Sequence, residues 1–283
     1  MFIGTEKIIL NKMKSALNKV LDKNNSGKFI CVGLDTDIKK IPPFLLNEKS
    51  PALVFNKMII DATKDYAAAY KINFAFYEQK GSRGIEELEK TVDLIPDDVL
   101  SIADAKRGDI GNTSVMYAKS IYEYFRFDAV TLHPYMGKDS LEPFLSFTDK
   151  LNFILALTSN PGANDFEKLM LSDNTPLYQK ILKSVNEWNQ RKNCGIVFGA
   201  TKIEELKTNI NSFSNLTVLL PGVGAQGGSL EEVAKIFSEN NRKNYLVNIS
   251  RGIIYKSSDK DFDLAAQKEL MNLNGVVSNF IVK

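Results

Sequence analysis

The stretch Val99-Leu-Ser-Ile-Ala103 is a short, almost continuous apolar run, and the charged segment Asp104-Ala-Lys106-Arg-Gly-Asp109 follows it directly. Uninterrupted runs rich in Val, Ile and Leu are typical of strands that are buried on both faces of a sheet. Seven further runs of this kind occur along the chain: Phe29–Leu34, Ala67–Ile72, Ala129–Leu132, Phe153–Leu157, Gly195–Phe198, Val218–Leu220 and Tyr245–Ile249. The chain is therefore predicted to contain eight buried strands.

Apolar residues recur at helical spacing between these runs. Examples are Leu53, Phe55, Met58, Ile59 and Ala62; Tyr117, Ile121 and Tyr124; and Leu177, Ile181, Leu182 and Val185. Strand and helix thus alternate eight times, which predicts an α/β fold with a parallel sheet covered by helices. Eight such units close most simply into a (β/α)₈ TIM barrel. A doubly wound open sheet is the alternative.

The 283 residues fit either one large α/β domain or two ordinary ones, because α/β barrels reach about 250 residues as a single unit. The segment Glu6–Asp22 carries Ile9, Met13, Leu17, Val20 and Leu21 on one helical face. It predicts an extra N-terminal helix that caps the bottom of the barrel. No linker, repeat or low-complexity stretch is present, so residues 1–283 are expected to form a single domain. Ile38–Ser50, Met136–Leu151 and Asn160–Pro176 are predicted loop insertions.

The composition excludes several classes of protein. The sequence has 36 Lys and Arg against 34 Asp and Glu, a net charge of +2, and 44% hydrophobic residues, which is typical of a soluble globular protein. Charges of both signs are interspersed, so we expect no nucleic-acid partner. No apolar run reaches the roughly 18 residues of a membrane helix, and Met1–Asp22 lacks a signal-type apolar core. A cytoplasmic protein without a membrane partner is predicted.

Cysteine and histidine are too few and too far apart for a typical metal site. Cys31 and Cys194 lie in separate apolar runs and are expected to be buried thiols. His133 is the only histidine, which rules out a His-rich zinc site. We expect both His133 and Trp188 to be structural. Chemistry must then depend on Asp, Lys, Arg, Ser and backbone groups.

Polar residues collect where the predicted strands end. They are Asp35, Lys71, Asp104, Lys106, His133, Ser159, the Gly222–Gly228 segment and Ser250-Arg251-Gly252. In a barrel the C-terminal ends of the strands form the active-site face, so residues that are distant in sequence converge there. Any one of these residues alone could be an ordinary polar strand end, but so many together favour a site.

The segment Asp104-Ala-Lys106-Arg-Gly-Asp109 is the most informative of these ends. In an extended segment positions i and i+2 share a face, so Asp104 and Lys106 should point into the same space. Gly108 then lets the chain turn and bring Asp109 round. A surface ladder of ion pairs is the alternative, although charges in a barrel wall are costly to desolvate and are better explained by chemistry. Lys71 is embedded in a buried pattern and could pair with Asp104 or Asp35.

A glycine-rich segment, Pro221-Gly-Val-Gly-Ala-Gln226-Gly-Gly228, follows the seventh strand, and a helix should begin near Ser229. Glycines let backbone N–H groups approach an anion, and a helix N-terminus favours negative charge. Arg251 follows the eighth strand, and loops after strands seven and eight are the recurrent phosphate site of barrels. A substrate that carries a phosphomonoester is predicted.

With these motifs in place, the sequence resembles the orotidine 5′-phosphate decarboxylase family, in its longer-loop branch. The resemblance covers nearly the whole chain, and its motifs are Val32-Gly-Leu-Asp35, Lys71-Ile-Asn73, Asp104-Ala-Lys106-Arg-Gly-Asp109-Ile-Gly-Asn-Thr113, Leu157-Thr-Ser159-Asn, Gly222-Val-Gly-Ala-Gln226-Gly-Gly and Ile249-Ser-Arg251-Gly252. It implies conversion of orotidine 5′-monophosphate to UMP and carbon dioxide in de novo pyrimidine biosynthesis, without metal or cofactor. It also implies a homodimer.

The resemblance further implies a role for each matched residue. Lys71, Asp104, Lys106 and Asp109 would form an alternating charged array, with Lys106 as the proton donor. Asp109 and Thr113 would reach the ribose from the partner subunit. The remaining matched residues would bind substrate: Asp35 and Asn73 at the ribose, Ser159 at the pyrimidine edge, and Gln226, Arg251 and Gly252 at the phosphate.

Two rival interpretations have different sequence requirements. Related decarboxylases that act on a hexulonate or hexulose phosphate with Mg²⁺ resemble the chain at Asp104 and Lys106, but carry a metal-binding carboxylate where this chain has Lys71. An ammonium at that position argues against them. A non-catalytic nucleotide-binding barrel would keep the phosphate loop and would not need the Asp/Lys array, so the array argues against it.

Overall fold

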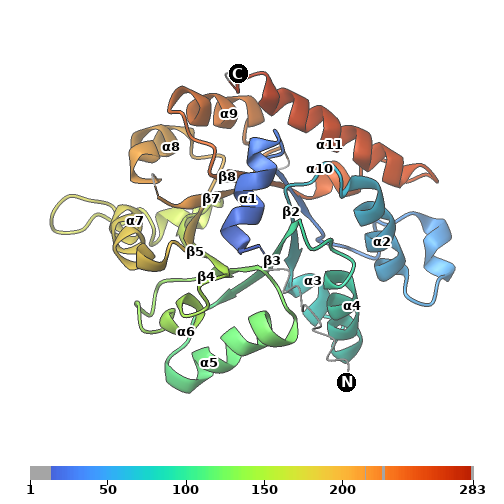
Figure 1. Ribbon diagram of the computed structural model, residues 1–283, viewed down its shortest axis with the longest axis horizontal. Coiled ribbons are helices and arrows are strands. Elements are labelled where there is room, and N and C mark those ends of the chain that lie inside the picture. The colour runs from blue at the N-terminus through green and yellow to red at the C-terminus, as the bar shows by residue number, and fades with distance from the viewer. Residues whose placement is uncertain (1–13, 214, 225–226, 282–283) are drawn as a thin grey trace, which may run out of the picture.

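The computed structural model describes residues 14–213, 215–224 and 227–281. Its centre is a closed barrel in which eight parallel strands follow one another in chain order (Figure 1). The strands are β1 (Ile30–Gly33), β2 (Ala69–Asn73), β3 (Leu100–Arg107), β4 (Ala129–Leu132), β5 (Leu151–Leu157), β6 (Cys194–Phe198), β7 (Thr217–Pro221) and β8 (Tyr245–Ile249). Strand β8 pairs with β1, which closes the barrel. The predicted TIM barrel is confirmed, and the open-sheet alternative is wrong.

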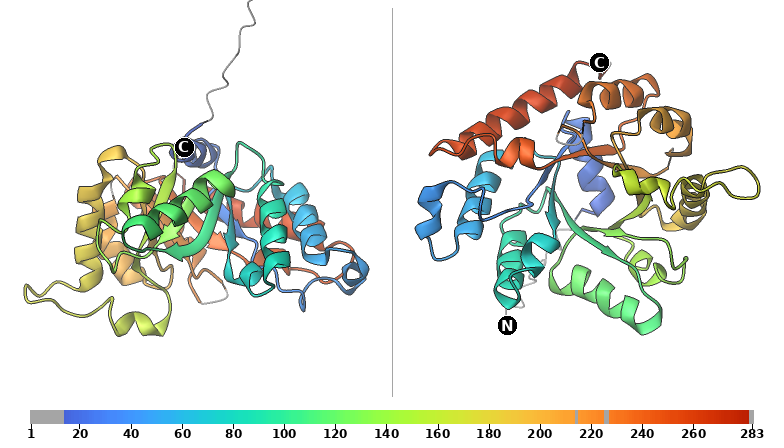
Figure 2. Two further views of the ribbon diagram at one scale, coloured as in Figure 1. Left: turned by 90° about the horizontal axis from the view of Figure 1, so that it is seen from below. Right: turned by 180° about the vertical axis from the view of Figure 1, so that it is seen from behind.

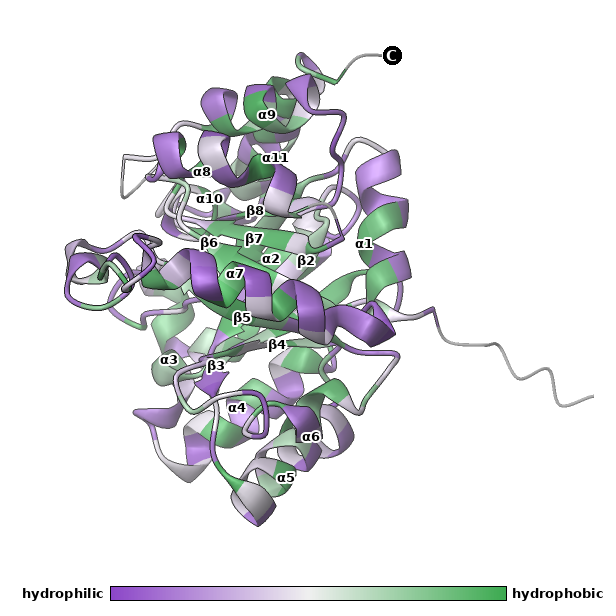
Figure 3. Ribbon diagram, turned by 90° about the vertical axis from the view of Figure 1, so that its left-hand side faces the viewer, coloured by the Kyte–Doolittle hydropathy of each residue, from purple (hydrophilic) through white to green (hydrophobic). Residues whose placement is uncertain are grey.

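Helices surround the barrel on its outer face (Figures 1 and 2). The longer ones are α2 (Pro51–Thr63), α4 (Ser82–Val92), α5 (Gly111–Lys119), α7 (Leu177–Trp188), α8 (Ile203–Asn209), α9 (Leu230–Glu239) and α11 (Phe262–Ser278), and the short ones are α3 (Ala75–Glu78), α6 (Glu142–Leu145) and α10 (Arg251–Ile254). The predicted helical spacings fall in α2, α7 and α5 with the π-helical turn Ser120–Tyr124 that follows it. The strands are apolar, while the outward faces of the helices are polar (Figure 3).

Two apolar cores result from the alternation of side chains along each strand. Outward-pointing side chains such as Ile154 and Val247 pack with helix residues such as Phe55 in a core that surrounds the barrel. Inward-pointing side chains, among them Cys31, Leu100, Ile102, Phe153, Leu219 and Leu246, fill the barrel interior. Because side chains alternate with a period of two, the next inward position after Ala69 in β2 is Lys71, and the next after Ile102 in β3 is Asp104. Apolar side chains therefore fill the barrel interior, and polar side chains line it at the C-terminal ends of the strands.

An N-terminal helix closes the opposite end of the barrel, but its bounds differ from the prediction. Helix α1 covers Ala16–Asn25 rather than Glu6–Asp22, and residues 6–13 lie outside the described residues. The Ser15 hydroxyl accepts a hydrogen bond from the Asn18 amide, so Ser15 is the N-cap that starts the helix. The face that meets the barrel interior consists of Ala16 and Val20, while Leu17 and Leu21 are only half-buried. The Lys19 ammonium reaches both oxygens of Asp128 at 2.8 Å.

The predicted insertions contain short ordered turns. Pro43–Asn47 forms a 3₁₀ turn in the first, α6 lies in the second, and strand β5 already begins at Leu151, the last residue of that insertion. The third projects from the barrel (Figures 1 and 3), begins with a 3₁₀ turn at Pro161–Asn164 and closes on itself where Met170 pairs with Pro176. Both cysteines are buried free thiols, as predicted. In the described ranges we find no helix with the length and apolar character needed to cross a membrane.

Candidate active site

A cavity of about 340 Å³ opens at the C-terminal ends of the strands. Eight of the predicted site residues line it: Asp35, Lys71, Asn73, Asp104, Lys106, Ser159, Arg251 and Gly252. They come from β1, β2, β3, β5 and β8 or from the segments that follow these strands directly. The barrel thus brings together residues that are more than 200 positions apart in the sequence.

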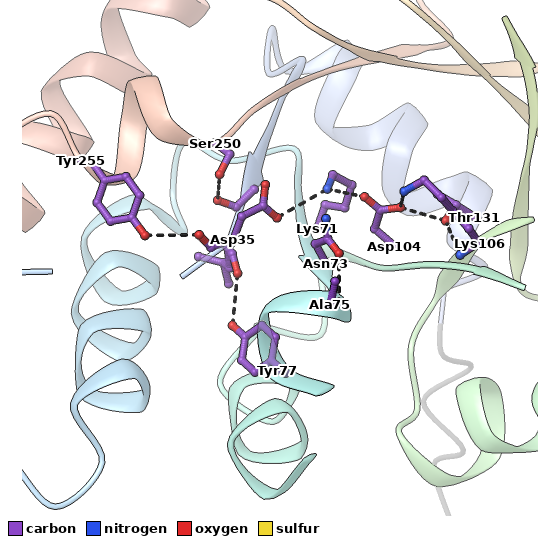
Figure 4. Close-up of polar contacts among 12 residues, drawn as sticks. Asp35, Lys71, Asn73, Ala75, Tyr77, Asp104, Lys106, Thr131, Ser250 and Tyr255 are labelled. Atoms are coloured by element: carbon purple, nitrogen blue, oxygen red, sulfur yellow. Dashed lines mark hydrogen bonds and ion pairs between the residues drawn. The ribbon is translucent and has the colours of Figure 1, made fainter. Parts of the chain in front are cut away.

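Lys71 lies at the centre of the charged part of this cavity (Figure 4). Its side chain is 5% exposed, and its Nζ donates to Asp104 Oδ2 at 2.8 Å and lies 3.7 Å from Asp35 Oδ1. Both pairings that the sequence left open are therefore present, and Asp104 is the nearer partner. Burial lowers the pKa of the Lys71 ammonium, but the carboxylates of Asp104 and Asp35 outweigh this effect and raise that pKa above its ordinary value. Lys71 is a buried cation at neutral pH.

Asp104 lies between two ammonium groups. Its Oδ2 accepts from Lys71, while its Oδ1 accepts from Lys106 Nζ at 2.5 Å and from the Thr131 hydroxyl at 3.0 Å. Burial raises the pKa of Asp104, but the two lysines outweigh it and hold the pKa of that carboxyl well below its usual value. The side chain of Lys106 is 53% exposed, whereas that of Asp104 is 11% exposed. The array thus runs from a buried cation through a buried anion to a cation at the cavity.

The backbone that carries Asp104 and Lys106 is not the regular extended strand that the sequence predicts. Strand β3 pairs with β4 at Ala103 and again at Arg107, and the register shifts between these two positions. Lys106 itself has a φ of 45°, in the left-handed region that non-glycine residues rarely adopt. The expectation that Asp104 and Lys106 face the same space is correct. Its physical basis is a bulge in β3 rather than simple alternation.

Gly108 also serves a different purpose from the predicted one. A Cβ atom at this position would lie 2.9 Å from the ring of His133 and from its carbonyl oxygen, which a side chain could not accommodate. Gly111, the first residue of α5, has a φ of 52°, a left-handed backbone that favours glycine. Gly108 is therefore needed for close packing on His133, and the backbone conformation that favours a glycine lies at Gly111.

Asp35 is held by the chain around it. The Tyr255 hydroxyl donates to the Asp35 carbonyl at 3.2 Å and accepts from the Asp37 amide at 2.7 Å. The Ser250 hydroxyl bonds the Gly33 carbonyl at 2.9 Å, which ties the end of β8 to that of β1. Asp35 Oδ1 is buried without a hydrogen-bond partner, 3.7 Å from Lys71.

The opposite wall consists of the segments after β7 and β8. Pro221, Gly222 and Val223 line the cavity, as do Ser250, Arg251 and Gly252. The amides of Gly224, Gly227 and Gly228 bond carbonyls within their own loop, and none of these glycines lines the cavity. Gln226 lies outside the described residues.

Helix α9 departs from the expected anion site. Its N-cap is Ser229, as predicted, and the Ser229 hydroxyl accepts from the Glu232 amide. Glu231 and Glu232 occupy the first turn, where two carboxylates repel a phosphate. These carboxylates weaken the attraction of the α9 N-terminus for an anion, and the exposed Arg251 is the cation on this side of the cavity.

Two of the predicted residues do not reach the cavity of their own chain. The Asp109 carboxylate accepts from the Ile110 amide at 2.8 Å just before α5 begins, and Thr113 is exposed on the first turn of that helix. His133 packs on Gly108, and Trp188 packs against the outer core. In the described ranges no group of three or more His, Cys, Asp or Glu side chains is arranged to hold a metal ion.

Sequence reasoning missed several residues of the cavity wall. Thr131, Leu155, Val197, Leu219 and Asn248 are inward-pointing strand residues that line it. Thr131 is 2% exposed and bonds both Asp104 and Lys106. Its position two residues after the inward-pointing Ala129 was a usable signal, but the bulge opposite it could not be read from the sequence.

The comparisons with known proteins agree with this geometry. The model of the orotidine 5′-phosphate decarboxylase / HUMPS family matches residues 28–264. The chain is 49% identical over 244 residues to orotidine 5′-phosphate decarboxylase of Porphyromonas gingivalis, covering 85% of this chain and 88% of that protein. With the enzyme of the same name from Christiangramia forsetii it shares 52% over 237 residues, or 83% and 86% of the two chains.

A solved structure gives the same result. That of Leishmania donovani OMP decarboxylase superposes with a TM-score of 0.79 at 32% identity, and the match covers 93% of this chain and 99% of that chain. These matches agree with the fold and with the charged array at the strand ends. The chain belongs to the orotidine 5′-phosphate decarboxylase / HUMPS family.

Proposed function

We propose that this chain decarboxylates orotidine 5′-monophosphate to UMP and carbon dioxide, the last step of de novo pyrimidine biosynthesis. The observation that carries the proposal is the array of Lys71, Asp104 and Lys106 at a cavity whose far wall carries Arg251. In this arrangement the Lys106 ammonium would lie beside the reacting end of a phosphorylated ligand, and Arg251 would lie at its phosphate end. A cation beside the reacting atoms suits a reaction that develops negative charge there.

The chemistry needs a cation beside the reacting carbon. When the bond between C6 and the carboxylate breaks, carbon dioxide leaves and the electron pair stays on C6, orthogonal to the ring π system. Lys106 is the proposed donor: its ammonium stabilises the developing charge, then passes one proton to C6 and is left as the neutral amine. The half-exposed side chain of Lys106 supports this role, because it can reach a ligand in the cavity.

Asp104 and Lys71 are proposed to hold the donor in place. Asp104 bonds Lys106 directly and stays ionised because of its depressed pKa, so it fixes the position and charge of the ammonium. Lys71 neutralises Asp104 from the buried side. Asp104 would also lie near the departing carboxylate, where a like charge disfavours the ground state.

The remaining residues are proposed to bind the substrate. Asp35 and Asn73 would contact the ribose, and their position in the cavity wall supports this assignment. Ser159 would bind the pyrimidine edge. Arg251, Gly252 and Gln226 would bind the phosphate, a contact remote from C6 whose energy can drive closure of the site over the base.

We also propose that the enzyme is a cytoplasmic homodimer in which Asp109 and Thr113 complete the cavity of the partner subunit. Both residues lie away from the cavity of their own chain. Apolar side chains close to them in the sequence are exposed, namely Ile110 and Met116 at 58% each, and Tyr135 after β4 is 88% exposed. A surface of this kind is typical of a protein–protein contact.

A substrate comparison tests the proposal. The purified chain is incubated with orotidine 5′-monophosphate, and in parallel with a hexulonate phosphate and a hexulose phosphate in the presence of Mg²⁺, and products are separated by chromatography. We expect UMP from the first incubation and no conversion of the sugar phosphates. Conversion of a sugar phosphate without formation of UMP would contradict the assignment.

A further inference from the structure

The bulge in β3 places three residues of one strand opposite a single residue of the next. Ala103 pairs with Val130 and Arg107 pairs with Leu132, so Asp104, Ala105 and Lys106 all face Thr131. In a regular strand Asp104 and Lys106 would be separated by about 6.6 Å along the chain. Here the backbone of Lys106 is left-handed instead, and from it the two side chains form an ion pair at 2.5 Å. The geometry of the array therefore depends on whatever holds the bulge.

Side chains replace the missing ladder partners of this bulge. The Lys106 amide donates to Thr131 Oγ1 at 3.1 Å, where a regular ladder would offer a backbone carbonyl. The Ala105 carbonyl accepts from the Arg107 guanidinium at 2.7 Å. Beyond the bulge the backbone ladder resumes, since the His133 amide donates to the Arg107 carbonyl at 3.0 Å. Because its backbone groups are satisfied in this way, the bulge is a stable feature of the fold.

The hydroxyl of Thr131 has only one possible hydrogen-bond orientation. The Lys106 amide can only donate, so Oγ1 must accept from it, and the ionised Asp104 can only accept, so the hydroxyl must donate its proton to Oδ1 at 3.0 Å. A single buried hydroxyl thus bonds the backbone of one charged residue and the side chain of the other. Figure 4 shows Thr131 beside both residues.

We infer that Thr131 is a positioning residue for the reaction of the proposed function: it sets the place of the Lys106 ammonium by holding the left-handed backbone at Lys106 and the carboxylate of Asp104 together. The left-handed φ of 45° is unfavourable for lysine by about 1–2 kcal/mol. Without an acceptor for its amide, Lys106 would relax toward the extended region and carry its side chain away from Asp104.

Four variants test this role. Thr131→Val keeps the shape of the side chain and removes the hydroxyl, while Thr131→Ser keeps the hydroxyl and removes the methyl group. Thr131→Ala differs from Thr131→Ser by the hydroxyl alone. If Thr131→Val does not fold, the comparison of the serine and alanine variants tests the role of the hydroxyl instead. Thr63→Val is the matched control, because Thr63 is fully buried and its hydroxyl bonds the Ile59 carbonyl in α2 and the hydroxyl of Tyr70 in β2, and neither Thr63 nor Tyr70 lines the cavity.

The kinetic result separates positioning from simple stability. We expect Thr131→Val and Thr131→Ala to lower kcat on the order of 10²-fold, since a displacement near 1 Å costs about that much. UMP affinity should stay within about twofold, Thr131→Ser should recover most of the turnover, and Thr63→Val should keep the wild-type kcat. Wild-type kcat in Thr131→Val or Thr131→Ala, or a serine variant as impaired as alanine, would overturn the inference.

The turnover of the wild-type chain decides the proposed function. A crystal structure tests the positioning role separately from it. In a crystal structure of Thr131→Val, or of Thr131→Ala in its place, Lys106 should leave the left-handed region and its Nζ should lie more than 4 Å from Asp104. An unchanged backbone and an intact ion pair would overturn the positioning role, even if the wild-type chain did not decarboxylate orotidine 5′-monophosphate.

Discussion

Replacement of Lys106 by alanine should abolish turnover and leave the fold intact, and the structure explains why the two effects separate. The Lys106 side chain is 53% exposed, and its described ion-pair partner is Asp104. Asp104 retains Lys71 at 2.8 Å after the substitution. Because the lysine of this pair is half-exposed and Asp104 keeps its buried partner Lys71, the free energy of unfolding should fall by only about 1 kcal/mol.

The expected loss of rate follows from the two roles of the ammonium group. General acid catalysis by a positioned side chain contributes about 10²–10⁴-fold, and one preorganised donor beside a developing charge contributes about 10²–10³-fold. Because Lys106 would supply both, the variant should lose roughly 10⁴–10⁷-fold in kcat, or about 5–10 kcal/mol of transition-state stabilisation.

A lysine elsewhere in the chain provides a close control. Lys90 in α4 is 54% exposed and bonds Glu86 at 2.5 Å, so it matches Lys106 in exposure and in ion-pair distance. Decarboxylation, urea denaturation and UMP binding are measured for both alanine variants. We expect only Lys106→Ala to lose turnover, with wild-type unfolding and UMP binding in both. A loss of less than about 100-fold, or an unfolded Lys106→Ala chain, would refute the reasoning.

Three further predictions concern assembly, anchoring and pH. Mixing Lys106→Ala with Asp109→Ala chains should restore about one quarter of wild-type activity, because half of the dimers would be hybrids with one intact site of two; no recovery would count against shared sites. Lys19→Met removes the buried partner of Asp128 and should lower the free energy of unfolding by about 3–5 kcal/mol in urea titrations, whereas a loss below about 1 kcal/mol would mean that α1 is held by other contacts. The pKa of Asp104 lies below its ordinary value of 3.8, so Asp104 stabilises the native state above that pH and loses this contribution as the pH falls below it. The free energy of unfolding of Asp104→Asn should therefore fall less steeply in acid than that of the wild type. Equal slopes for the two proteins would show that Asp104 contributes nothing.

The strands could be predicted from the sequence because burial on both faces leaves a clear pattern. All eight apolar runs overlap observed strands, and most of the polar residues that follow them meet at one cavity, whereas His133 packs on Gly108 instead. The extent of β3 could not be predicted, since Asp104 and Lys106 are charged yet continue the strand through a bulge. The bulge nevertheless leaves both side chains facing the cavity, so their predicted pairing is correct although the predicted regular backbone is not.

Other errors have a similar physical origin. Helix α1 was misplaced because its barrel-facing side includes Lys19 and Lys23, which are buried through ion pairs that an apolar pattern does not reveal. The helix after the glycine segment was expected to favour phosphate, but Glu231 and Glu232 in its first turn oppose this. The residue roles, the dimer and the single domain of 1–283 remain predictions, because one chain without ligand does not test them.

The most direct test of the central claim follows the absorbance of orotidine 5′-monophosphate in the presence of the purified wild-type chain, with and without EDTA. The account predicts that the absorbance of the substrate falls as UMP forms, at the same rate in both conditions, because Lys71, Asp104 and Lys106 supply the charges that the reaction needs. A constant absorbance, or activity that disappears with the chelator, would contradict it.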